Sequence, residues 1–155
     1  MPVLTSTIHD EEEMEDLAAS LSPRLKAGDV VTLSGDLGAG KTAFARALIN
    51  VMSEEPEEVP SPTFTLVQVY ETDAGTDIWH FDLYRLPEEE MDILELGWEE
   101  ARRFGISLVE WPDRLGSLLP ADRLEISIEF HKDSENMRSV TLTPHGKMIP
   151  RMEGL

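Results

Sequence analysis

Cysteine and basic side chains are what this sequence lacks most. Among its 155 residues there is no cysteine, and 13 lysines and arginines stand against 31 aspartates and glutamates, a formal net charge of −18. The absence of cysteine excludes disulfides and thiolate metal sites. Because affinity for a phosphate backbone depends on Lys and Arg, the charge argues against unaided binding of RNA or DNA. A basic protein is the more natural partner.

Long apolar segments are missing as well. No run of about 18 apolar residues occurs, so we expect no membrane-spanning helix. Residues 1–20 carry acids and lack a basic start with an apolar core, so we expect no signal peptide and a cytoplasmic location. Hydrophobic residues make up 41% of the chain, enough for a packed core. We therefore predict one domain over residues 1–145, followed by a weakly patterned and mobile tail over 146–155.

Residues 35–42, with the sequence GDLGAGKT, fit the pattern of a phosphate-binding loop. Glycines let the backbone turn tightly, which brings successive N–H groups close to phosphate oxygens. Lys41 then supplies a positive charge for the β and γ phosphates, and the Thr42 hydroxyl supplies a ligand for Mg²⁺. The residues predicted to bind the nucleotide phosphates are Gly35, Asp36, Leu37, Gly38, Ala39, Gly40, Lys41 and Thr42.

The segments on either side of the loop support this interpretation. Residues 30–33 predict a buried strand, and residues 44–52 predict a helix with Phe44, Leu48 and Val51 on one face. A helix that follows the loop points its positive N-terminus at a bound anion. The alternative is a glycine turn that only joins strand to helix. The order of strand, loop and helix favours the binding of a nucleotide triphosphate.

Hydrophobic periodicity predicts the other elements of an α/β fold. An edge strand or extended arm at residues 2–8 precedes a helix that Asp10 caps, with Glu13 completing the arrangement. The remaining predicted elements are a hairpin of strands at 66–70 and 78–84, a helical segment at 87–104 broken near Gly97, a buried strand at 106–109, and two antiparallel strands, around 124–130 and 140–142, added to one side of the sheet.

Two carboxylates are candidates for the chemistry of the loop. A phosphate loop needs an acid near Mg²⁺, normally at the carboxyl end of a neighbouring parallel strand. Glu110 closes the apolar run 106–109 and fits that place, although it also fits a simple strand cap. Asp82 lies among apolar neighbours, where an unpaired carboxylate is costly. Its partner is the metal, an attacking water, or a nearby Arg85 or His80. A salt bridge with a purely structural role remains an alternative.

Two further features carry candidate functional groups. Ser61, Thr63 and Thr65 lie between the loop helix and the next strand, where P-loop switches sense the γ-phosphate. In that interpretation their hydroxyls reach phosphate, metal or water. The alternative is that the segment is an ordinary turn. Trp111 follows the strand that ends at Glu110. It stacks on a base or on a partner, or it belongs to the core.

Four motifs, GDLGAGKT (35–42), SPTFTLV (61–67), HFDLYRL (80–86) and LVEWP (108–112), occur in this order and closely resemble the TsaE (YjeE) family. Members of this family are bacterial P-loop ATPases required for the threonylcarbamoyladenosine modification of tRNA beside the anticodon. The resemblance covers about residues 10–130. It implies a small P-loop NTPase-like α/β domain, with a parallel central sheet flanked by antiparallel strands and helices.

The resemblance also implies cofactors and partners. ATP and Mg²⁺ would bind at the loop. The proteins TsaB and TsaD would be partners, with TsaD holding the catalytic centre for carbamoyl transfer. ATP hydrolysis would reset the complex of TsaB and TsaD between turnovers. The chain would reach tRNA only through this complex, and no membrane would be involved.

By matching position, the resemblance implies roles for several residues. Lys41 would contact phosphate, and Thr42 and Glu110 would hold Mg²⁺. Asp82 would serve ATP hydrolysis by ordering water. Thr65 would belong to a switch-like loop, so the implied catalytic residues are Asp82, Lys41 and Thr65.

The same resemblance extends to the nucleotide pocket. Glu11, at the start of the first helix, would line this pocket, and Trp111 would lie by the nucleotide or by the partner surface. One departure is the segment 68–70, Gln-Val-Tyr, where relatives often carry an acid before the tyrosine. The late strands diverge, so the sequence leaves the base-contacting residues there open.

Two functions from different classes follow. The first is an Mg²⁺-dependent ATPase that serves tRNA modification, and the second is an ATP-gated assembly module in which hydrolysis is incidental. A small-molecule kinase is disfavoured because a chain of 155 residues has no room for an Arg-rich lid and an acceptor domain. A GTPase is disfavoured because no guanine-reading N-K-x-D motif is present.

Overall fold

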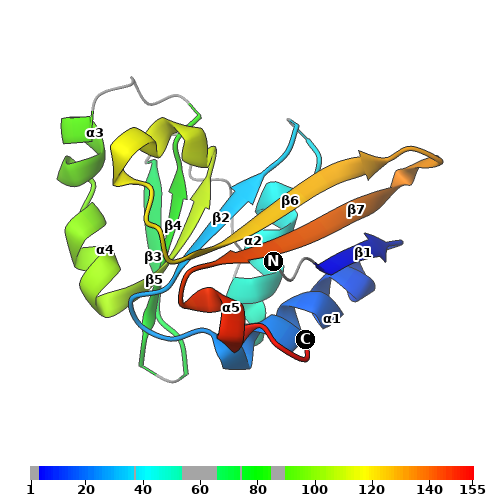
Figure 1. Cartoon of the computed structure of the whole chain (residues 1–155), viewed down its shortest axis with the longest axis horizontal. Coiled ribbons are helices and arrows are strands. Elements are labelled where there is room, and N and C mark those ends of the chain that lie inside the picture. The colour runs from blue at the N-terminus through cyan, green and yellow to red at the C-terminus, as the bar shows by residue number, and fades with distance from the viewer. Residues whose placement is uncertain (1–3, 37, 54–65, 74, 85–89) are drawn as a thin grey trace.

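The computed structural model describes residues 4–36, 38–53, 66–73, 75–84 and 90–155. In this part of the chain seven strands form one mixed sheet in the order β1-β7-β6-β2-β5-β4-β3 (Figure 1). The strands are β1 (Leu4–Ile8), β2 (Val30–Ser34), β3 (Val67–Tyr70), β4 (Asp77–Asp82), β5 (Gly105–Glu110), β6 (Arg123–His131) and β7 (Ser134–His145). The helices are α1 (Glu11–Leu21), α2 (Lys41–Met52), α3 (Glu90–Glu95), α4 (Trp98–Phe104) and α5 (Met148–Arg151), with 3₁₀ helices η1 (Ser22–Arg24) and η2 (Pro112–Leu118).

Four parallel strands, β6, β2, β5 and β4, form the centre of the sheet. Around them β3 runs antiparallel to β4, β7 to β6, and β1 to β7. The α/β class with a parallel centre and antiparallel edges is therefore confirmed. One detail differs from the prediction, which placed both late strands outside the parallel set: β6 is parallel to β2, and β7 opposes it. Periodicity shows which face a strand buries and not its direction.

Parallel pairing brings the carboxyl ends of three strands to one edge of the sheet. Leu33 of β2 is aligned with Glu110 of β5, and Glu110 is aligned with Asp82 of β4. The loop that follows β2 begins at this same edge. Open α/β sheets bind ligands at the carboxyl ends of their strands. The topology therefore places both candidate carboxylates beside the glycine-rich loop.

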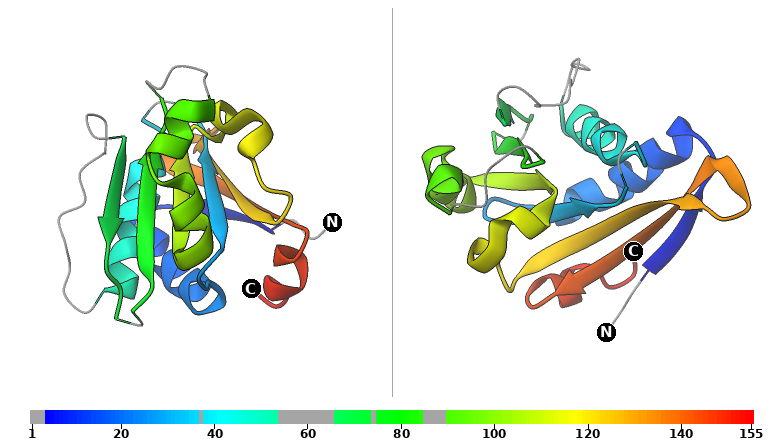
Figure 2. Two further views of the ribbon diagram at one scale, coloured as in Figure 1. Left: turned by 90° about the vertical axis from the view of Figure 1, so that its left-hand side faces the viewer. Right: turned by 90° about the horizontal axis from the view of Figure 1, so that it is seen from above.

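Helices cover both faces of the sheet (Figure 2). On one face α1 and α2 contribute to the larger core cluster, which includes Phe44 and Leu48. On the other, α3, α4 and η2 surround a second cluster that contains Phe81, Trp98 and Val109. None of the helices in the described ranges is long and apolar enough to cross a membrane.

The buried face of α2 is wider than the predicted one. Phe44 and Leu48 are fully buried as expected, but Val51 is 37% exposed, so the prediction for Val51 is wrong. Ala45 and Ile49 are fully buried instead. Two adjacent residues in each turn therefore face the sheet, which gives the broad apolar stripe of a helix that packs against a core.

The cap predicted for α1 is confirmed. The Asp10 carboxylate accepts a hydrogen bond from the N–H of Glu13 at 2.9 Å, as an N-cap does. Glu13 reaches back to the N–H of His9 at 3.0 Å, one residue before the cap, and its carboxylate also contacts the His9 ring. This hydrogen bonding holds the pKa of Glu13 below its usual range. The helix therefore starts at the residue that the sequence indicated.

The last ten residues pack against the domain, which their weak patterning did not predict. Met148 and Met152, one turn apart, are buried in the larger core cluster. Arg151 forms an ion pair with the buried Asp29 at the start of the central strand. Arg24 donates hydrogen bonds to the carbonyls of Arg151, at 3.0 Å, and Glu153, at 2.6 Å. A four-residue helix is too short for hydrophobic periodicity to show.

Candidate nucleotide-binding site

The phosphate loop joins β2 to α2 as predicted. Gly40, with φ of 117°, precedes the first helical residue, Lys41. The Lys41 ammonium folds back on its own loop and donates hydrogen bonds to the carbonyls of Gly35, at 2.6 Å, and Asp36, at 3.0 Å. At 5% exposure Lys41 is buried rather than extended into solvent. Burial lowers the pKa of Lys41, while the negative charges of nearby Glu110, Asp82 and Asp36 raise it.

The first two glycines of the loop, Gly35 and Gly38, meet different surroundings. Gly35 has φ of 146°, and a Cβ added there would lie 2.0 Å from the carbonyl oxygen of Ile128 on β6. Gly38 has φ of 81°, and a Cβ there would meet no described heavy atom within 4 Å. Only the first glycine is required by close packing of the backbone against the sheet.

We expect Gly35→Ala to lower the free energy of unfolding by more than about 2 kcal/mol, because strand and loop must separate to admit the methyl group. Gly38→Ala is the matched control. It carries only the strain of an alanine at positive φ, about 1–2 kcal/mol. Urea unfolding of both variants measures the difference. Equal losses of stability would contradict the assigned packing role of Gly35.

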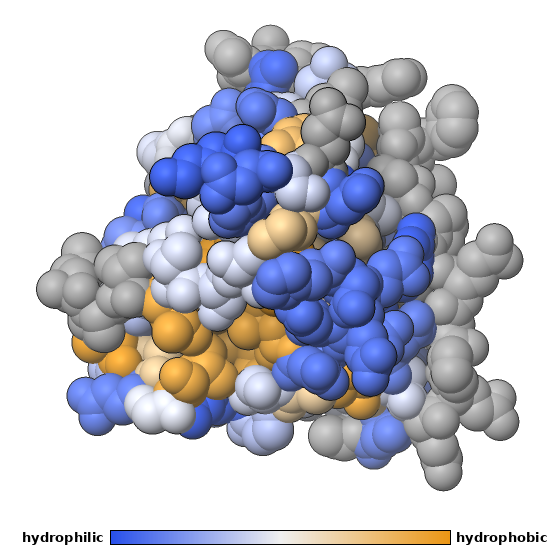
Figure 3. Space-filling model, turned by 90° about the vertical axis from the view of Figure 1, so that its right-hand side faces the viewer, coloured by the Kyte–Doolittle hydropathy of each residue, from blue (hydrophilic) through white to orange (hydrophobic). Residues whose placement is uncertain are grey.

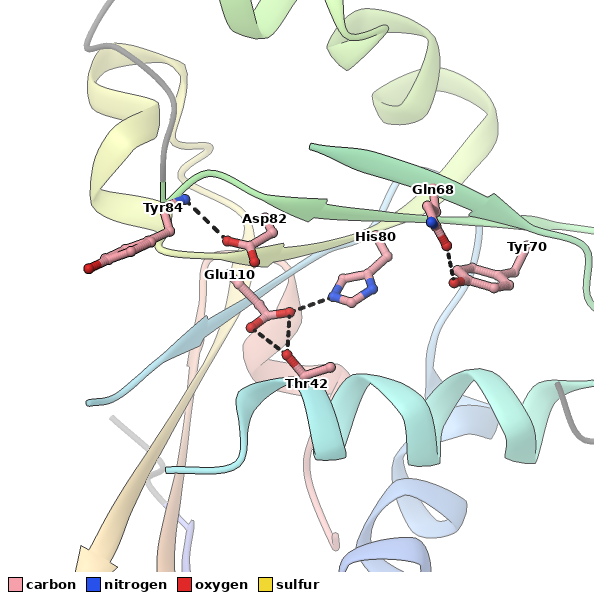
Figure 4. Close-up of polar contacts among 7 residues, drawn as sticks. All are labelled: Thr42, Gln68, Tyr70, His80, Asp82, Tyr84 and Glu110. Atoms are coloured by element: carbon pink, nitrogen blue, oxygen red, sulfur yellow. Dashed lines mark hydrogen bonds and ion pairs between the residues drawn. The ribbon is translucent and has the colours of Figure 1, made fainter. Parts of the chain in front are cut away.

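Thr42 and Glu110, the predicted Mg²⁺ ligands, lie in direct contact. The Thr42 hydroxyl, in the first turn of α2, lies 3.1 and 3.2 Å from the two carboxylate oxygens of Glu110, to which it donates (Figure 4). Glu110 ends β5 and is 3% exposed. The described residues hold no cluster of three or more acidic or histidine side chains that would form an all-protein cage. A hydroxyl and a carboxylate fit Mg²⁺, which takes few protein ligands and completes its shell with phosphates and water.

Asp82 lies beside this pair at the end of β4. Side chains alternate along β4: Phe81 joins the second core cluster, while His80 and Asp82 are turned to the side of α2 (Figure 4). One carboxylate oxygen of Asp82 accepts a hydrogen bond from the N–H of Tyr84 at 3.1 Å. Asp82 is 8% exposed. It therefore reaches the mouth of the site with its orientation fixed by its own turn.

The proposed pairing of Asp82 with His80 is wrong. The His80 Nε2 lies 2.6 Å from Glu110, not Asp82, and its Nδ1 has no hydrogen-bond partner among the described residues. The other suggested partner, Arg85, lies outside the described residues. The sequence places His80 and Asp82 two residues apart, and therefore on one face of a strand. It did not indicate that the imidazole contacts Glu110.

Trp111 packs against the core, which is one of its two predicted roles, and its stacking on a base or on a partner stays a prediction. It has φ of 61° and ψ of 56°, a left-handed conformation that turns the chain sharply after β5. Its ring packs against the second core cluster. The Lys41 ammonium also lies 4.2 Å from the centroid of that ring, within the range of a cation–π contact. The exposed ring of Tyr84 covers Trp111 at 4.8 Å between centroids.

A pocket of about 250 Å³ lies next to the loop, between the start of α1, α2 and the start of β7. Glu11 lines it together with Gly40 of the loop. Two lining residues, Arg46 and Arg138, were not indicated by any motif. Arg138 donates a hydrogen bond from Nε to the carbonyl of Ala39 at 2.8 Å. An isolated arginine in an acidic chain was the only sequence signal for it.

The outer side of α1 remains a solvated surface. Its exposed acids are Glu11, Glu12, Glu15 and Asp16. On this side of the molecule strongly hydrophilic areas adjoin an apolar one (Figure 3). Of the predicted site residues, Leu37 and Thr65 lie outside the described part of the chain, as do Ser61 and Thr63. Their roles stay predictions.

Comparison with known proteins shows the family of the chain. The profile of the family described as "Threonylcarbamoyl adenosine biosynthesis protein TsaE" matches residues 8–140. The chain belongs to the TsaE family. The TsaE protein of Rickettsia felis is 41% identical over 133 residues, which cover 86% of this chain and 77% of that protein. The Bacillus subtilis TsaE is 38% identical over 136 residues, 87% of this chain and 82% of that protein.

A solved structure extends the match to the fold. The crystal structure of Bacillus subtilis YdiB superposes with a TM-score of 0.75 at 31% identity, covering 94% of this chain and 87% of that one. The TsaE family consists of P-loop-type nucleotide-binding proteins that take part in tRNA threonylcarbamoyladenosine biosynthesis. The resemblance inferred from the four motifs is therefore confirmed.

Proposed function

We propose that the chain is an Mg²⁺-dependent ATPase that supports threonylcarbamoyladenosine modification of tRNA by binding and resetting the TsaB–TsaD complex. The observation that carries this proposal is the convergence of Lys41, Thr42, Glu110 and Asp82 at the carboxyl ends of β2, β5 and β4. Three separate segments deliver an ammonium, a hydroxyl and two carboxylates to one loop. That set matches what phosphoryl transfer from a triphosphate requires.

The loop residues bind and orient the triphosphate. Lys41 already lies within the loop, where phosphate oxygens replace the carbonyls of Gly35 and Asp36 as acceptors from its ammonium. Its position at the start of α2 adds the positive end of the helix dipole. The Thr42 hydroxyl donates a hydrogen bond to Glu110, which leaves its oxygen lone pairs available for a cation. When bound, Mg²⁺ supplies charge neutralisation on the β and γ phosphates.

Asp82 orients the attacking water. One oxygen of its carboxylate accepts the N–H of Tyr84, which orients the side chain at the carboxyl end of β4. The ring of Trp111, with Tyr84 on its outer side, screens Lys41 from solvent. Exclusion of water strengthens the electrostatic interactions of the ammonium with phosphate.

The pocket lined by Glu11 and Arg138 accepts the nucleoside end of ATP, because it adjoins the loop at Gly40. The strongly acidic surface favours protein partners over tRNA itself, so tRNA is reached through TsaD and TsaB in the cytoplasm. Phosphate release from ATP tests the proposal, with the chain alone, with TsaB and TsaD, and with EDTA. We expect slow release by the chain alone, faster release with both partners, and none in EDTA. No release with both partners present would overturn the enzymatic role.

One observation favours a second candidate, an ATP-gated assembly module in which hydrolysis is incidental. Asp82 accepts the N–H of Tyr84 and so shapes the turn after β4, which is a structural task. In this case ATP holds the complex together and Asp82 is dispensable for chemistry. An Asp82→Ala variant that binds ATP and still supports continuous modification would favour this candidate.

A further inference from the structure

His80 is a fully buried histidine whose contact the ATPase mechanism above does not use. It lies on β4 with no exposed surface. Its Nε2 is 2.6 Å from Oε2 of Glu110. Nδ1 has no hydrogen-bond partner among the described residues. A buried polar atom without a partner, such as Nδ1, is unfavourable. The contact between Nε2 and Glu110 is therefore what holds the ring in this position.

The contact determines where the ring carries its proton. An ionised carboxylate only accepts hydrogen bonds, so the short approach requires a hydrogen on Nε2. In the neutral imidazole Nδ1 is then the bare nitrogen. The Nε2–H tautomer leaves Nδ1 as a buried acceptor without a described partner. In the Nδ1–H tautomer, the lone pair of Nε2 would instead point at a lone pair of Glu110 Oε2. The geometry therefore selects the Nε2–H form.

The sheet register explains how His80 reaches Glu110. On neighbouring parallel strands His80 is aligned with Leu108, and Asp82 is aligned with Glu110. His80 is therefore aligned with the position two residues before Glu110, on the same face of the sheet. Figure 4 shows the Glu110 carboxylate between the His80 ring on one side and the Thr42 hydroxyl on the other. The ring contacts only Oε2, so Oε1 is shared with no group other than Thr42 among the residues drawn.

We propose that His80 is a positioning residue that fixes the carboxylate of Glu110, so that Oε1 and the Thr42 hydroxyl oxygen are presented together to Mg²⁺. This inference rests on the proposed function, since it assigns His80 to the same cation site. Groups that hold a ligating carboxylate from behind commonly tune metal affinity, and their loss costs about 10- to 100-fold. The side chain acts through Glu110 and touches neither nucleotide nor metal.

A matched pair of amides tests the proposal. The amide nitrogen of glutamine extends about as far from the backbone as Nε2, whereas that of asparagine extends only to the level of Nδ1. We expect His80→Asn to weaken the apparent affinity for Mg²⁺ by about 10- to 100-fold. We expect His80→Gln to stay within about threefold of the unaltered chain, because it retains the donor. Calorimetric titration of Mg²⁺ into the chain with ATP measures both.

Measurements in EDTA separate this role from a structural one. ATP affinity without Mg²⁺ should be the same in all three chains, since among the described residues the His80 ring hydrogen-bonds to Glu110 alone. Equal Mg²⁺ dependence in His80→Asn and the unaltered chain would overturn the inference. So would an equal loss in both variants. If the unaltered chain itself showed no Mg²⁺-dependent binding of ATP, the proposed function would fail first.

A second measurement needs no variant and remains available if His80→Asn does not fold. Long-range ¹H–¹⁵N NMR spectra distinguish the two neutral tautomers of a histidine ring. The unaltered chain without nucleotide should show His80 with its proton on Nε2. A proton on Nδ1 alone would break the contact with Glu110 and overturn the proposal.

Discussion

Replacing Lys41 with alanine is expected to lower the affinity for ATP by roughly 30- to 4,000-fold. Removing one partner of a buried, hydrogen-bonded charge pair costs about 2–5 kcal/mol, and each 1.4 kcal/mol is tenfold in affinity. Lys41 is 5% exposed and bonds to two loop carbonyls before any nucleotide arrives. Lys41 must give up these hydrogen bonds in order to bind phosphate oxygens. It therefore contributes less to the free energy of ATP binding than a lysine that is free in solvent.

Two further variants make this measurement specific. Lys41→Met retains a long, unbranched apolar side chain and removes the ammonium that lies over Trp111, so it should lose as much affinity as Lys41→Ala. Lys132→Ala removes the same charge from an exposed position in the turn between β6 and β7, and should leave ATP affinity unchanged. Calorimetry with ATP and Mg²⁺ measures all four chains. Unaltered affinity in Lys41→Met would exclude a phosphate contact by this lysine.

The parts of the site that could be predicted from the sequence are those fixed by local pattern. The glycine-rich loop between an apolar strand and a helix places Lys41 and Thr42 without knowledge of the rest of the fold. Glu110 could be predicted because it ends an apolar run, and parallel strands end at one edge of a sheet. Both predictions depend only on the order of neighbouring residues.

Contacts between distant segments could not be predicted in the same way. His80 and Glu110 are 30 positions apart, and Arg138 and Ala39 are 99 apart. Periodicity assigned His80 to the right face of its strand, but the register with β5 decides which carboxylate it contacts. The position of Arg138 depends on the direction of β7, which apolar alternation does not give.

Asp82→Asn is expected to reduce the turnover number of ATP hydrolysis by about 10²- to 10⁴-fold, the usual contribution of a residue that takes or directs a proton in the transition state. The amide oxygen can still accept the N–H of Tyr84, so the turn after β4 is retained. ATP affinity should change by only a few-fold, because Lys41, Thr42 and the loop are unaltered. A fall in turnover with binding preserved is the signature of an interaction made in the transition state. Phosphate release with TsaB and TsaD, measured beside calorimetry, gives both values.

Asp77→Asn supplies the matched control for Asp82→Asn. Asp77 is on the same strand but at its other end, where β4 aligns with the start of β5, so the same chemical change there should leave turnover unaltered. The effect of Asp82→Asn on tRNA modification also separates the two candidate functions. An ATPase that resets its partners stops supporting modification when Asp82 is neutralised, because the complex stays in the ATP-bound state after one turnover. An assembly module needs only binding, so Asp82→Asn would sustain modification over many turnovers at an undiminished rate.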